Sequence, residues 1–290
     1  MNGRGKTARK GAGASKSGAA PLKVAVAGAL GRMGVAVLTV ASRSGDIRVV
    51  AGWERPGHPA LGSDLGVAAG LPALGVSLGA GPQVDGADVV IDFTTPSSTL
   101  ANIEAAKKSK ARPGLVIGTT GFTPAERAKV QAASKQLRLV LSSNYAVGVN
   151  LLWKALDLVA RVTGDDYDVE VIEAHHHHKK DSPSGTAMTT AEVLAKALKR
   201  DLPVWARYGR PHGNIGPRDP REIGLHTVRG GDIVGDHTVL FAGAGERLEF
   251  KHQAHSRENF AGGALRAGRW LAAPGRRAGL YTMAQVLGLD

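Results

Sequence analysis

The chain of 290 residues is long enough for one large core or two modest ones, and its apolar content of 43% is ordinary for a globular protein. No stretch approaches the roughly 18 consecutive apolar residues of a membrane-spanning helix, so we expect no contact with a membrane. The chain has no cysteine, which excludes disulfides and thiolate chemistry and is typical of a protein of the reducing cytoplasm.

The formal net charge of +12 raises the alternative of a nucleic-acid-binding protein. Part of this charge comes from the first 20 residues, which hold no acid and the basic side chains Arg4, Lys6, Arg9, Lys10 and Lys16. Their Gly-, Ala- and Ser-rich composition cannot form a core, which predicts a disordered basic tail over residues 1–21. The tail lacks the apolar stretch of a secretory signal, and a transit peptide is the less favoured interpretation. We expect the remaining charge to attract an anionic cofactor or substrate rather than nucleic acid.

The first half of the chain alternates strand and helix signals. Strands are expected at 22–27, 48–53, 88–93, 115–117 and 137–141, helices at 35–42, 97–110 and 124–136, and irregular chain at 56–86. Strands separated by helices of this length predict a parallel sheet with right-handed crossovers, and hence an α/β fold.

The second half shows a different pattern. Helices are expected at 149–162, 186–199 and 258–271, strands at 168–173, 223–229, 236–242 and 246–253, and turns at 230–231 and 243–245. Several strands in succession with few helices predict a second, smaller α+β domain with a largely antiparallel sheet. The last helix is expected to return to the first domain.

Three glycines with the spacing Gly28-x-x-Gly31-x-x-Gly34 stand where the first strand leads into the first helix. Glycine there lets the backbone approach a pyrophosphate, which the free N–H groups of the helix N-terminus bind. Because the usual spacing is G-x-G-x-x-G, an ordinary tight turn is the alternative. Glu54 ends the second strand where an acid binds the ribose hydroxyls, and Arg55 beside it can pair with a 2′-phosphate. The two together predict use of both NADH and NADPH.

Two further loops follow later strands of the expected parallel sheet, namely Gly118-Thr-Thr-Gly121 and Ser142-Ser-Asn-Tyr145. The carboxyl edge of such a sheet is where nucleotide ligands lie, although each loop taken alone is also compatible with a simple turn.

Residues 173–186 read Glu-Ala-His-His-His-His-Lys-Lys-Asp-Ser-Pro-Ser-Gly-Thr and suit a small polyanionic substrate that must be protonated. The alternatives are an affinity tag, a metal site and a solvated basic loop. A tag is disfavoured because the run lies between a strand and a helix. A metal is disfavoured because adjacent histidines on an extended chain point to opposite faces and a neighbouring lysine repels a dication. We therefore expect no metal.

The turn that begins at Asp181 opens the next helix, so its N–H groups can hold a carboxylate. Lys179 or Lys180 can place a charge beside that carboxylate, and a histidine can transfer a proton near neutral pH. Extended geometry sends His175 and His177 to one face and His176 and His178 to the other, which leaves the choice of histidine open.

The chain resembles the dihydrodipicolinate reductase family from residue 22 to its C-terminus. The segments that carry the resemblance are Ala27-Gly-Ala-Leu-Gly-Arg-Met-Gly34, Ile91-Asp-Phe-Thr94, Val116-Ile-Gly-Thr-Thr-Gly-Phe122, Asn144-Tyr-Ala-Val-Gly-Val-Asn150, Glu173-Ala-His-His-His-His-Lys179, Asp181-Ser-Pro-Ser-Gly-Thr-Ala187 and Arg229-Gly-Gly-Asp-Ile-Val-Gly-Asp-His237. The chain departs from the family pattern at His177, where members often carry arginine.

The resemblance implies reduction of 4-hydroxy-tetrahydrodipicolinate to tetrahydrodipicolinate by NADH or NADPH with loss of water, a step of lysine and diaminopimelate synthesis. It implies a Rossmann-like domain at 22–144 and 257–290, and a domain at 145–256 that binds the small dicarboxylate and builds a homotetramer. The rival functions are a basic nucleic-acid-binding protein and a metal-dependent hydrolase.

The resemblance also implies site residues. His175 is the expected general acid/base and Lys179 a proton donor. The expected carboxylate-binding residues are His176, Lys179, Ser184, Gly185 and Thr186. The expected cofactor-binding residues are Gly28, Ala29, Leu30, Gly31, Arg32, Met33, Glu54, Arg55, Phe93, Thr94, Gly118, Thr119, Thr120, Ser142, Ser143, Asn144 and Tyr145.

Overall fold

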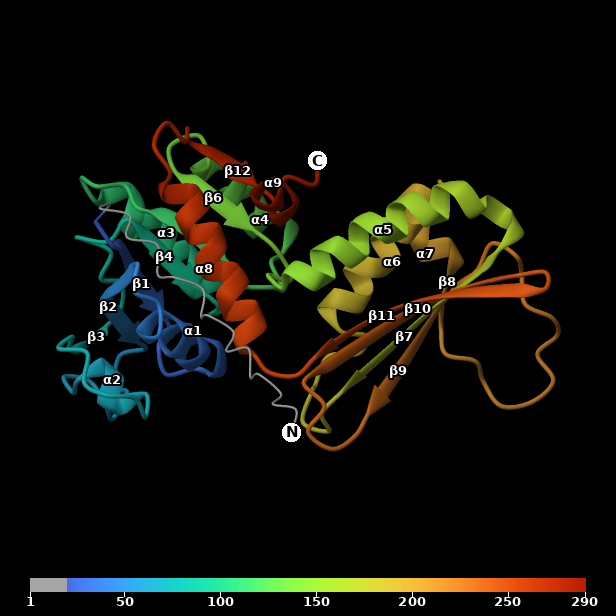
Figure 1. The fold of residues 1–290 in the computed structure, drawn as a ribbon, viewed down its shortest axis with the longest axis horizontal. Coiled ribbons are helices and arrows are strands. Elements are labelled where there is room, and N and C mark those ends of the chain that lie inside the picture. The colour runs from blue at the N-terminus through green and yellow to red at the C-terminus, as the bar shows by residue number, and fades with distance from the viewer. Residues whose placement is uncertain (1–19) are drawn as a thin grey trace, which may run out of the picture.

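The computed structural model describes residues 20–290, which form two β-sheets with helices packed on them (Figure 1). The expected disordered tail lies outside the described residues, apart from positions 20 and 21. Within 20–290, no helix combines the length and the apolar character needed to span a membrane.

The first sheet has seven strands in the order β12-β6-β5-β4-β1-β2-β3, and all its pairs are parallel. Its strands are β1 (Leu22–Ala27), β2 (Ile47–Glu54), β3 (Leu78–Ala80), β4 (Val89–Asp92), β5 (Gly114–Ile117), β6 (Arg138–Leu141) and β12 (Gly279–Tyr281). The expected α/β domain with a parallel sheet is confirmed.

Helices cover both faces of this sheet. They are α1 (Arg32–Ser42), α3 (Pro96–Lys108), α4 (Pro124–Ala133) and α8 (Glu258–Ala272). On β4, Val89 and Ile91 pack with α1 and α8, whereas Val90 packs with α3 and α4. Both sides of each central strand are therefore buried, which explains why these strands are continuous apolar runs in the sequence.

Some short elements were not predicted. The region 56–86, expected to be irregular, contains the single-turn helix α2 (Leu65–Ala68) and the edge strand β3. Near the C-terminus, β12 pairs with β6 and is followed by α9 (Met283–Leu287). The C-terminal segment thus belongs to the first sheet.

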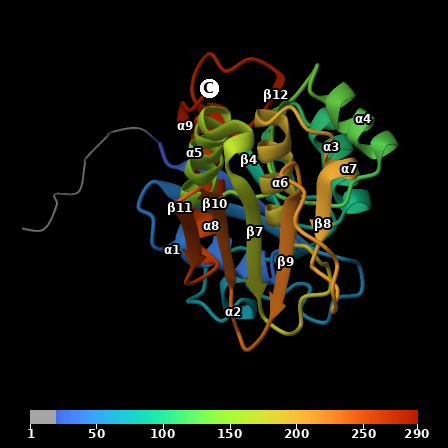
Figure 2. The same ribbon diagram turned by 90° about the vertical axis from the view of Figure 1, so that its right-hand side faces the viewer.

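The second sheet has five strands in the order β11-β10-β7-β9-β8. They are β7 (Asp168–His175), β8 (Ala206–Tyr208), β9 (Ile223–Arg229), β10 (Gly235–Gly243) and β11 (Glu246–Ala254). The helical segments of this part are α5 (Val147–Thr163), the 3-10 turn Gly164–Asp166, α6 (Gly185–Ala197) and α7 (Leu202–Trp205). Helices α5 and α6 pack on one face, and no helix of residues 20–290 covers the other (Figure 2).

The expectation of a largely antiparallel second sheet needs correction, because the sheet is mixed. Strand β10 is antiparallel to β7 and β11, but β9 is parallel to β7 and β8. The reason is that α6 follows β7 and returns the chain to the same end of the sheet, so the next strands run in the same direction as β7. The turn at 243–245 joins the hairpin β10–β11 as expected, whereas 230–231 leads past β7, which lies between β9 and β10.

The chain passes between the sheets twice, after β6 into α5 and after β11 into α8 (Figure 1). We therefore propose the division of the chain expected from the sequence, with 22–144 and 257–290 around the first sheet and 145–256 around the second.

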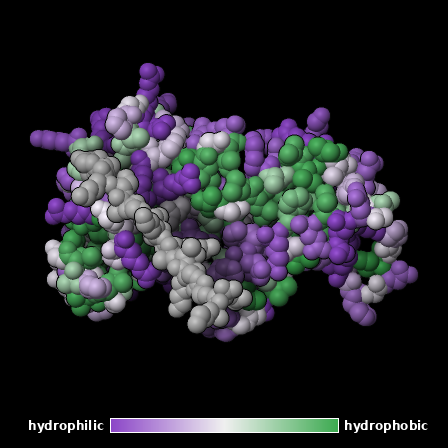
Figure 3. All heavy atoms as spheres, viewed as in Figure 1, coloured by the Kyte–Doolittle hydropathy of each residue, from purple (hydrophilic) through white to green (hydrophobic). Residues whose placement is uncertain are grey.

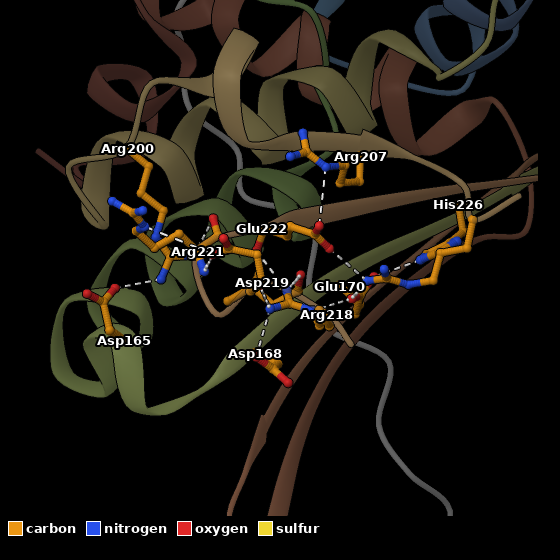
Figure 4. Close-up of polar contacts among 12 residues, drawn as sticks. Asp165, Asp168, Glu170, Arg200, Arg207, Arg218, Asp219, Arg221, Glu222 and His226 are labelled. Carbon is orange, nitrogen blue, oxygen red and sulfur yellow. Dashed lines mark hydrogen bonds and ion pairs between the residues drawn. The ribbon is translucent and has the colours of Figure 1, made fainter. Parts of the chain in front are cut away.

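A network of ion pairs lies on the open face of the second sheet (Figure 4). Glu170 of β7 accepts hydrogen bonds from Arg218 Nε at 2.8 Å, Arg210 Nη2 at 3.0 Å and His226 Nε2 at 2.7 Å. Arg218 also bonds Asp168 at 2.7 Å. Since Arg210 and Arg218 belong to the long connection between β8 and β9, these bonds fasten that connection to the sheet.

Replacing Arg218 by methionine should lower the free energy of unfolding by about 2 kcal/mol, because it removes the partner of two carboxylates from a half-buried network. The matched control is Arg221→Met. Arg221 is more exposed, lies 4.0 Å from Asp219 and stacks over Trp205, so its loss should cost less than about 1 kcal/mol. Urea denaturation measures both, and equal losses would show that the network does not stabilise the fold.

Candidate active site

The glycine motif forms a tight turn in which the backbone packs so closely that there is no room for a side chain at Gly34. Strand β1 ends at Ala27, and α1 begins at Arg32 without a side-chain cap. Gly28 has φ +60°, and a Cβ on Gly34 would collide with the carbonyl oxygen of Gly28. An uncapped helix N-terminus behind a glycine turn fits the pyrophosphate of a dinucleotide.

Glu54 stands at the carboxyl end of β2, next to this turn. Its Oε1 accepts a hydrogen bond from the backbone N–H of Leu30 at 2.9 Å, so the acid is held beside the glycine motif. Arg55 follows it and is exposed. The positions fit a ribose and its 2′-substituent at the edge of the turn.

The loops after β4 and β5 also meet here. A Cβ on Gly118 would overlap the ring of Phe93, so the absence of a side chain lets this ring lie against the loop. Asp92 is fully buried and accepts hydrogen bonds from Thr94 Oγ1 at 2.6 Å and from Asn102 Nδ2 at 2.9 Å. Its buried carboxylate, which was not singled out from the sequence, fixes the loop that carries Phe93 and Thr94.

The side chain of Tyr145 is part of the core. Its side chain is fully buried, and its hydroxyl lies 3.0 Å from the carbonyl oxygen of Ile117 and 2.9 Å from that of Val140. Burial raises the pKa of Tyr145 well above its usual value, so the hydroxyl stays protonated and donates to the backbone. The ring meets Phe93 edge to face at 5.6 Å.

On β7, alternate side chains from Val169 and Val171 to Glu173 and His175 share the face covered by helices. His175 is 8% exposed, and its Nδ1 lies 2.6 Å from Oε2 of Glu173. The face that is apolar along most of the strand therefore becomes polar at its carboxyl end.

The alternation of the four histidines does not continue past His175. The strand ends there, and the chain turns while His176 N–H donates to Ile233 and His177 N–H donates to Gly231. His177 and His178 are exposed, with ring centroids 3.9 Å apart. The expected assignment of faces by extended geometry therefore does not apply to His176, His177 and His178.

The start of α6 is held by hydrogen bonds of its buried N-cap residue. Ser184 is the N-cap, and its Oγ accepts a bond from Ala187 N–H at 3.1 Å and lies 3.0 Å from His237 Nε2. Ser184 is 2% exposed, so its hydroxyl serves the helix rather than the pocket. Of the expected carboxylate-binding turn, Gly185 and Thr186 offer the N–H groups of the first helical turn.

Residues from both expected sets meet in one pocket of about 260 Å³ between the two sheets, whereas Gly28, Glu54, Arg55 and Ser184 are not part of its lining. Its lining comprises Arg32, Met33, Phe93, Gly118, Ser143, Asn144, Tyr145, His175, His176, Lys179, Thr186, Val234, Arg257 and Phe260. The parts of the chain touch beside it, since Asn144 Nδ2 donates to Thr186 Oγ1 at 3.0 Å and Ser143 Oγ lies 3.0 Å from Thr189 Oγ1. Thr119, Thr120, Ser142 and Gly185 line a neighbouring pocket of about 500 Å³.

The smaller pocket is electropositive. Among the described residues, its lining includes Arg32, His176, Lys179 and Arg257 but no acid. Burial, together with Arg32 and Arg257, lowers the pKa of His176. Lys179 Nζ pairs at 2.9 Å with Asp181, whose side chain is 59% exposed. Such a pocket attracts polyanions. Within 20–290, no three His, Asp or Glu side chains are grouped to hold a metal ion.

Sequence reasoning did not assign roles to Glu173, Arg229, His237, Arg257 or Phe260. Glu173 is 1% exposed and pairs with Arg229 at 2.9 Å, and His237 lies across from Glu173 on β10. The signal was present for Glu173 and Arg229, which both lie in quoted motifs, but their pairing joins strands that are far apart in the sequence.

Comparison with known proteins places the chain in a family. The family described as "Dihydrodipicolinate reductase, N-terminus" matches residues 22–145, and "Dihydrodipicolinate reductase, C-terminus" matches 148–287. The fold and the site define a nicotinamide-dependent oxidoreductase with a Rossmann-like domain. The chain belongs to the dihydrodipicolinate reductase family, and the prediction of that family is confirmed.

Two similar sequences carry the same name. The 4-hydroxy-tetrahydrodipicolinate reductase of Geobacter metallireducens is 50% identical over 271 residues, which cover 92% of this chain and 99% of the relative. The enzyme of the same name from Nitrosospira multiformis is 48% identical over 269 residues, covering 92% and 98%.

Solved structures support the fold. A dipicolinate-bound dihydrodipicolinate reductase from Paenisporosarcina sp. TG-14 superposes with a TM-score of 0.69 at 23% identity, covering 91% of this chain and 98% of that one. GenD2 from gentamicin A biosynthesis, in complex with NAD, superposes with a TM-score of 0.58 at 13% identity, covering 96% and 93%.

His237 generates a prediction about acid stability. Burial, and next the neighbouring His175, lowers the pKa of His237 from 6.5 to about 3. Between these two pH values His237 is protonated in the unfolded chain but not in the folded chain. The free energy of unfolding therefore falls as the pH falls from 6.5 towards 3. His237→Gln should remove up to about 1.4 kcal/mol per pH unit of this dependence.

Urea denaturation at pH 6.5 and at pH 5 measures the slope, with the exposed His212→Gln as the matched control. An unchanged slope in His237→Gln, or an equal change in the control, would contradict the assignment of this acid sensitivity to the buried histidine.

Proposed function

We propose that the chain reduces 4-hydroxy-tetrahydrodipicolinate to tetrahydrodipicolinate with loss of water, a step of lysine and diaminopimelate synthesis, using NADH or NADPH. The observation that carries this proposal is the shared pocket, in which His175, Lys179 and Thr186 face Arg32, Met33 and Gly118 of the dinucleotide-binding part. The close relatives of that name, at 48–50% identity over nearly their whole length, support it.

The nicotinamide, when bound, supplies the hydride. The residues of the chain then have three tasks in the proposed reaction. The glycine turn and the start of α1 hold the pyrophosphate, and the loops that carry Phe93 and Gly118 hold the nicotinamide end. The start of α6 and Lys179 hold the carboxylates of the substrate.

His175 supplies the proton. The hydroxyl of the substrate first leaves as water, which gives a cyclic unsaturated imine dicarboxylate. Hydride addition to this imine leaves an electron pair that must take up one proton, and a positioned acid on the pocket wall provides it. The Lys179–Asp181 pair is partly exposed and worth less than about 1 kcal/mol, so a substrate carboxylate can replace Asp181 at low cost.

A homotetramer remains part of the proposal. On the face of the second sheet away from α5 and α6, which no helix of residues 20–290 covers, Val228 is 48% exposed. Apolar residues also gather along α5, where Leu158 and Val162 are exposed (Figure 3). Surfaces of this kind are typical of subunit contacts. The cytoplasmic location expected from the absence of cysteine stays a prediction.

The four single His→Gln variants of residues 175–178 test the function and the assignment together. His175→Gln should lower kcat by about 10²–10⁴, the usual effect of losing a positioned acid, with little change in cofactor affinity. The exposed His177→Gln is the matched control and should stay near wild type. Oxidation of NAD(P)H followed by absorbance, with freshly generated substrate, measures both. If His177→Gln is crippled while His175→Gln is active, the catalytic assignment is wrong, and if the wild-type chain oxidises no NAD(P)H, the function is wrong.

Glu54 and Arg55 should divide the preference between the two cofactors. Glu54→Ala removes an acceptor for the ribose hydroxyls and should weaken NADH more than NADPH. Arg55→Ala removes a cation for the 2′-phosphate and should weaken NADPH more. Titration of each variant with both cofactors measures this, and equal effects on both cofactors in both variants would refute this placement of the ribose.

A further inference from the structure

We infer that Glu173 is a positioning residue that acts through His175, because one buried carboxylate orients the imidazole of His175 and fixes the first turn of α6. The inference rests on the proposed function, in which His175 gives the proton and the start of α6 holds a substrate carboxylate. It adds a residue that does not itself face the substrate.

Glu173 is 1% exposed, and both of its oxygens are used. Oε2 lies 2.6 Å from His175 Nδ1 and accepts from Arg229 Nη1 at 2.9 Å. Oε1 accepts from Arg229 Nη2 at 2.9 Å, from Ser184 N–H at 3.0 Å and from Thr227 Oγ1 at 3.3 Å. The carboxylate therefore links β7, β9 and the start of α6.

The contact with His175 decides which ring nitrogen reacts. Since a carboxylate accepts hydrogen bonds, Nδ1 carries a proton, and Nε2 is left to give or take one. Nε2 faces Gly235, where a Cβ would lie only 3.0 Å away. The ring is thus held on one side by Glu173 and approached closely on another by a residue without a side chain.

The contact with α6 places the proton donor relative to the substrate. Ser184 is the N-cap of α6, and its N–H bonds the same carboxylate that orients His175. Arg229 also donates to the carbonyl oxygen of Asp181 at 2.8 Å, which fastens the turn before α6. The imidazole and the carboxylate-binding N–H groups are therefore fixed to one another through Glu173.

The carboxylate of Glu173 stays ionised although it is buried. Burial raises the pKa of Glu173, but the hydrogen bonds from His175, Arg229 and Ser184 outweigh it and lower the value to about 2. The other titratable groups around His175 are His176, the next residue, and His237 of β10, whose ring lies 5.2 Å away. Arg32, Lys179 and Arg257 line the same pocket. Burial keeps His237 uncharged at neutral pH. Glu173 is the charged group that hydrogen-bonds this ring, and Arg229 bonds the same carboxylate.

A purely structural role for Glu173 is the competing explanation, and Glu170 gives a matched control for it. Glu170 lies on the same strand, on the opposite face, and also bonds a histidine and two arginines. It lines no wall of the pocket that contains His175. If the carboxylates of β7 only stabilise the fold, Glu170→Gln and Glu173→Gln should have similar effects on kcat and on the pH profile.

The kinetic test compares the two variants in the full chain with NADH and freshly generated substrate, after thermal melts establish that each is folded. Glu173→Gln should lower kcat at least about 10-fold with a smaller change in the KM for NADH. Its activity should also begin to fall at a lower pH on the alkaline side, because an amide does not stabilise the imidazolium form. Glu170→Gln should leave kcat and the pH profile unchanged. A Glu173→Gln enzyme with wild-type kcat and pH profile, or an equal loss in Glu170→Gln, overturns the inference.

A second measurement uses the wild-type chain alone and does not depend on catalytic activity. Nitrogen-15 NMR of the histidine rings in the wild-type chain, at a pH where His175 is neutral, reports its tautomer. A proton on Nδ1 supports the inference and a proton on Nε2 overturns it. If the wild-type chain reduces no substrate, the proposed function fails, and the tautomer still decides whether Glu173 orients His175.

Discussion

The arrangement of the second sheet depends on one buried carboxylate. Glu173 occupies a position on β7 that continues the apolar face of Val169 and Val171, so the fold places a charge where the core would otherwise continue. Burying an unpaired carboxylate costs several kcal/mol, and the pairing with Arg229 and the N–H of Ser184 offsets that cost. The strand β9, the turn before α6 and the histidine run must therefore take up positions that satisfy it.

The two parts of the chain together form one site that is suited to anionic ligands. The dinucleotide-binding part contributes the uncapped N-terminus of α1, and the other part contributes the first turn of α6, which Ser184 caps. The N–H groups at the start of a helix favour anions. Between them, Arg32 and Arg257 add positive charge, and desolvation together with Arg32 lowers the pKa of Arg257. The cost of holding these cations close together falls when an anion binds between them. A cofactor with phosphates and a substrate with two carboxylates are ligands that meet this requirement.

The sequence predicts what local chemistry determines. The bounds of β1 and β9 agree with the expected strands, and the glycine turn is where it was expected, because apolar runs and glycine spacing are local signals. The three-residue strands β3, β8 and β12 were missed, since so few residues show no periodicity and their pairing is set by distant strands. The mixed character of the second sheet was missed because direction depends on where α6 returns the chain. In the site, the individual residues could be named from motifs, but the bond between Glu173 and Arg229 joins β7 to β9, which no local pattern encodes.

The four histidines show how tertiary contacts resolve a sequence that periodicity leaves ambiguous. Alternation treats His175 and His177 as equivalent, and it holds only while the chain remains a strand. The loop after β9 pairs with the backbone of His176 and His177 and turns the chain away, so the equivalence ends at the strand terminus. His175 keeps a buried ring with one nitrogen fixed by a carboxylate, whereas His177 is exposed and its ring lies tilted against that of His178. A proton donor needs a defined orientation and tautomer, and of these two positions only the one inside the strand supplies both.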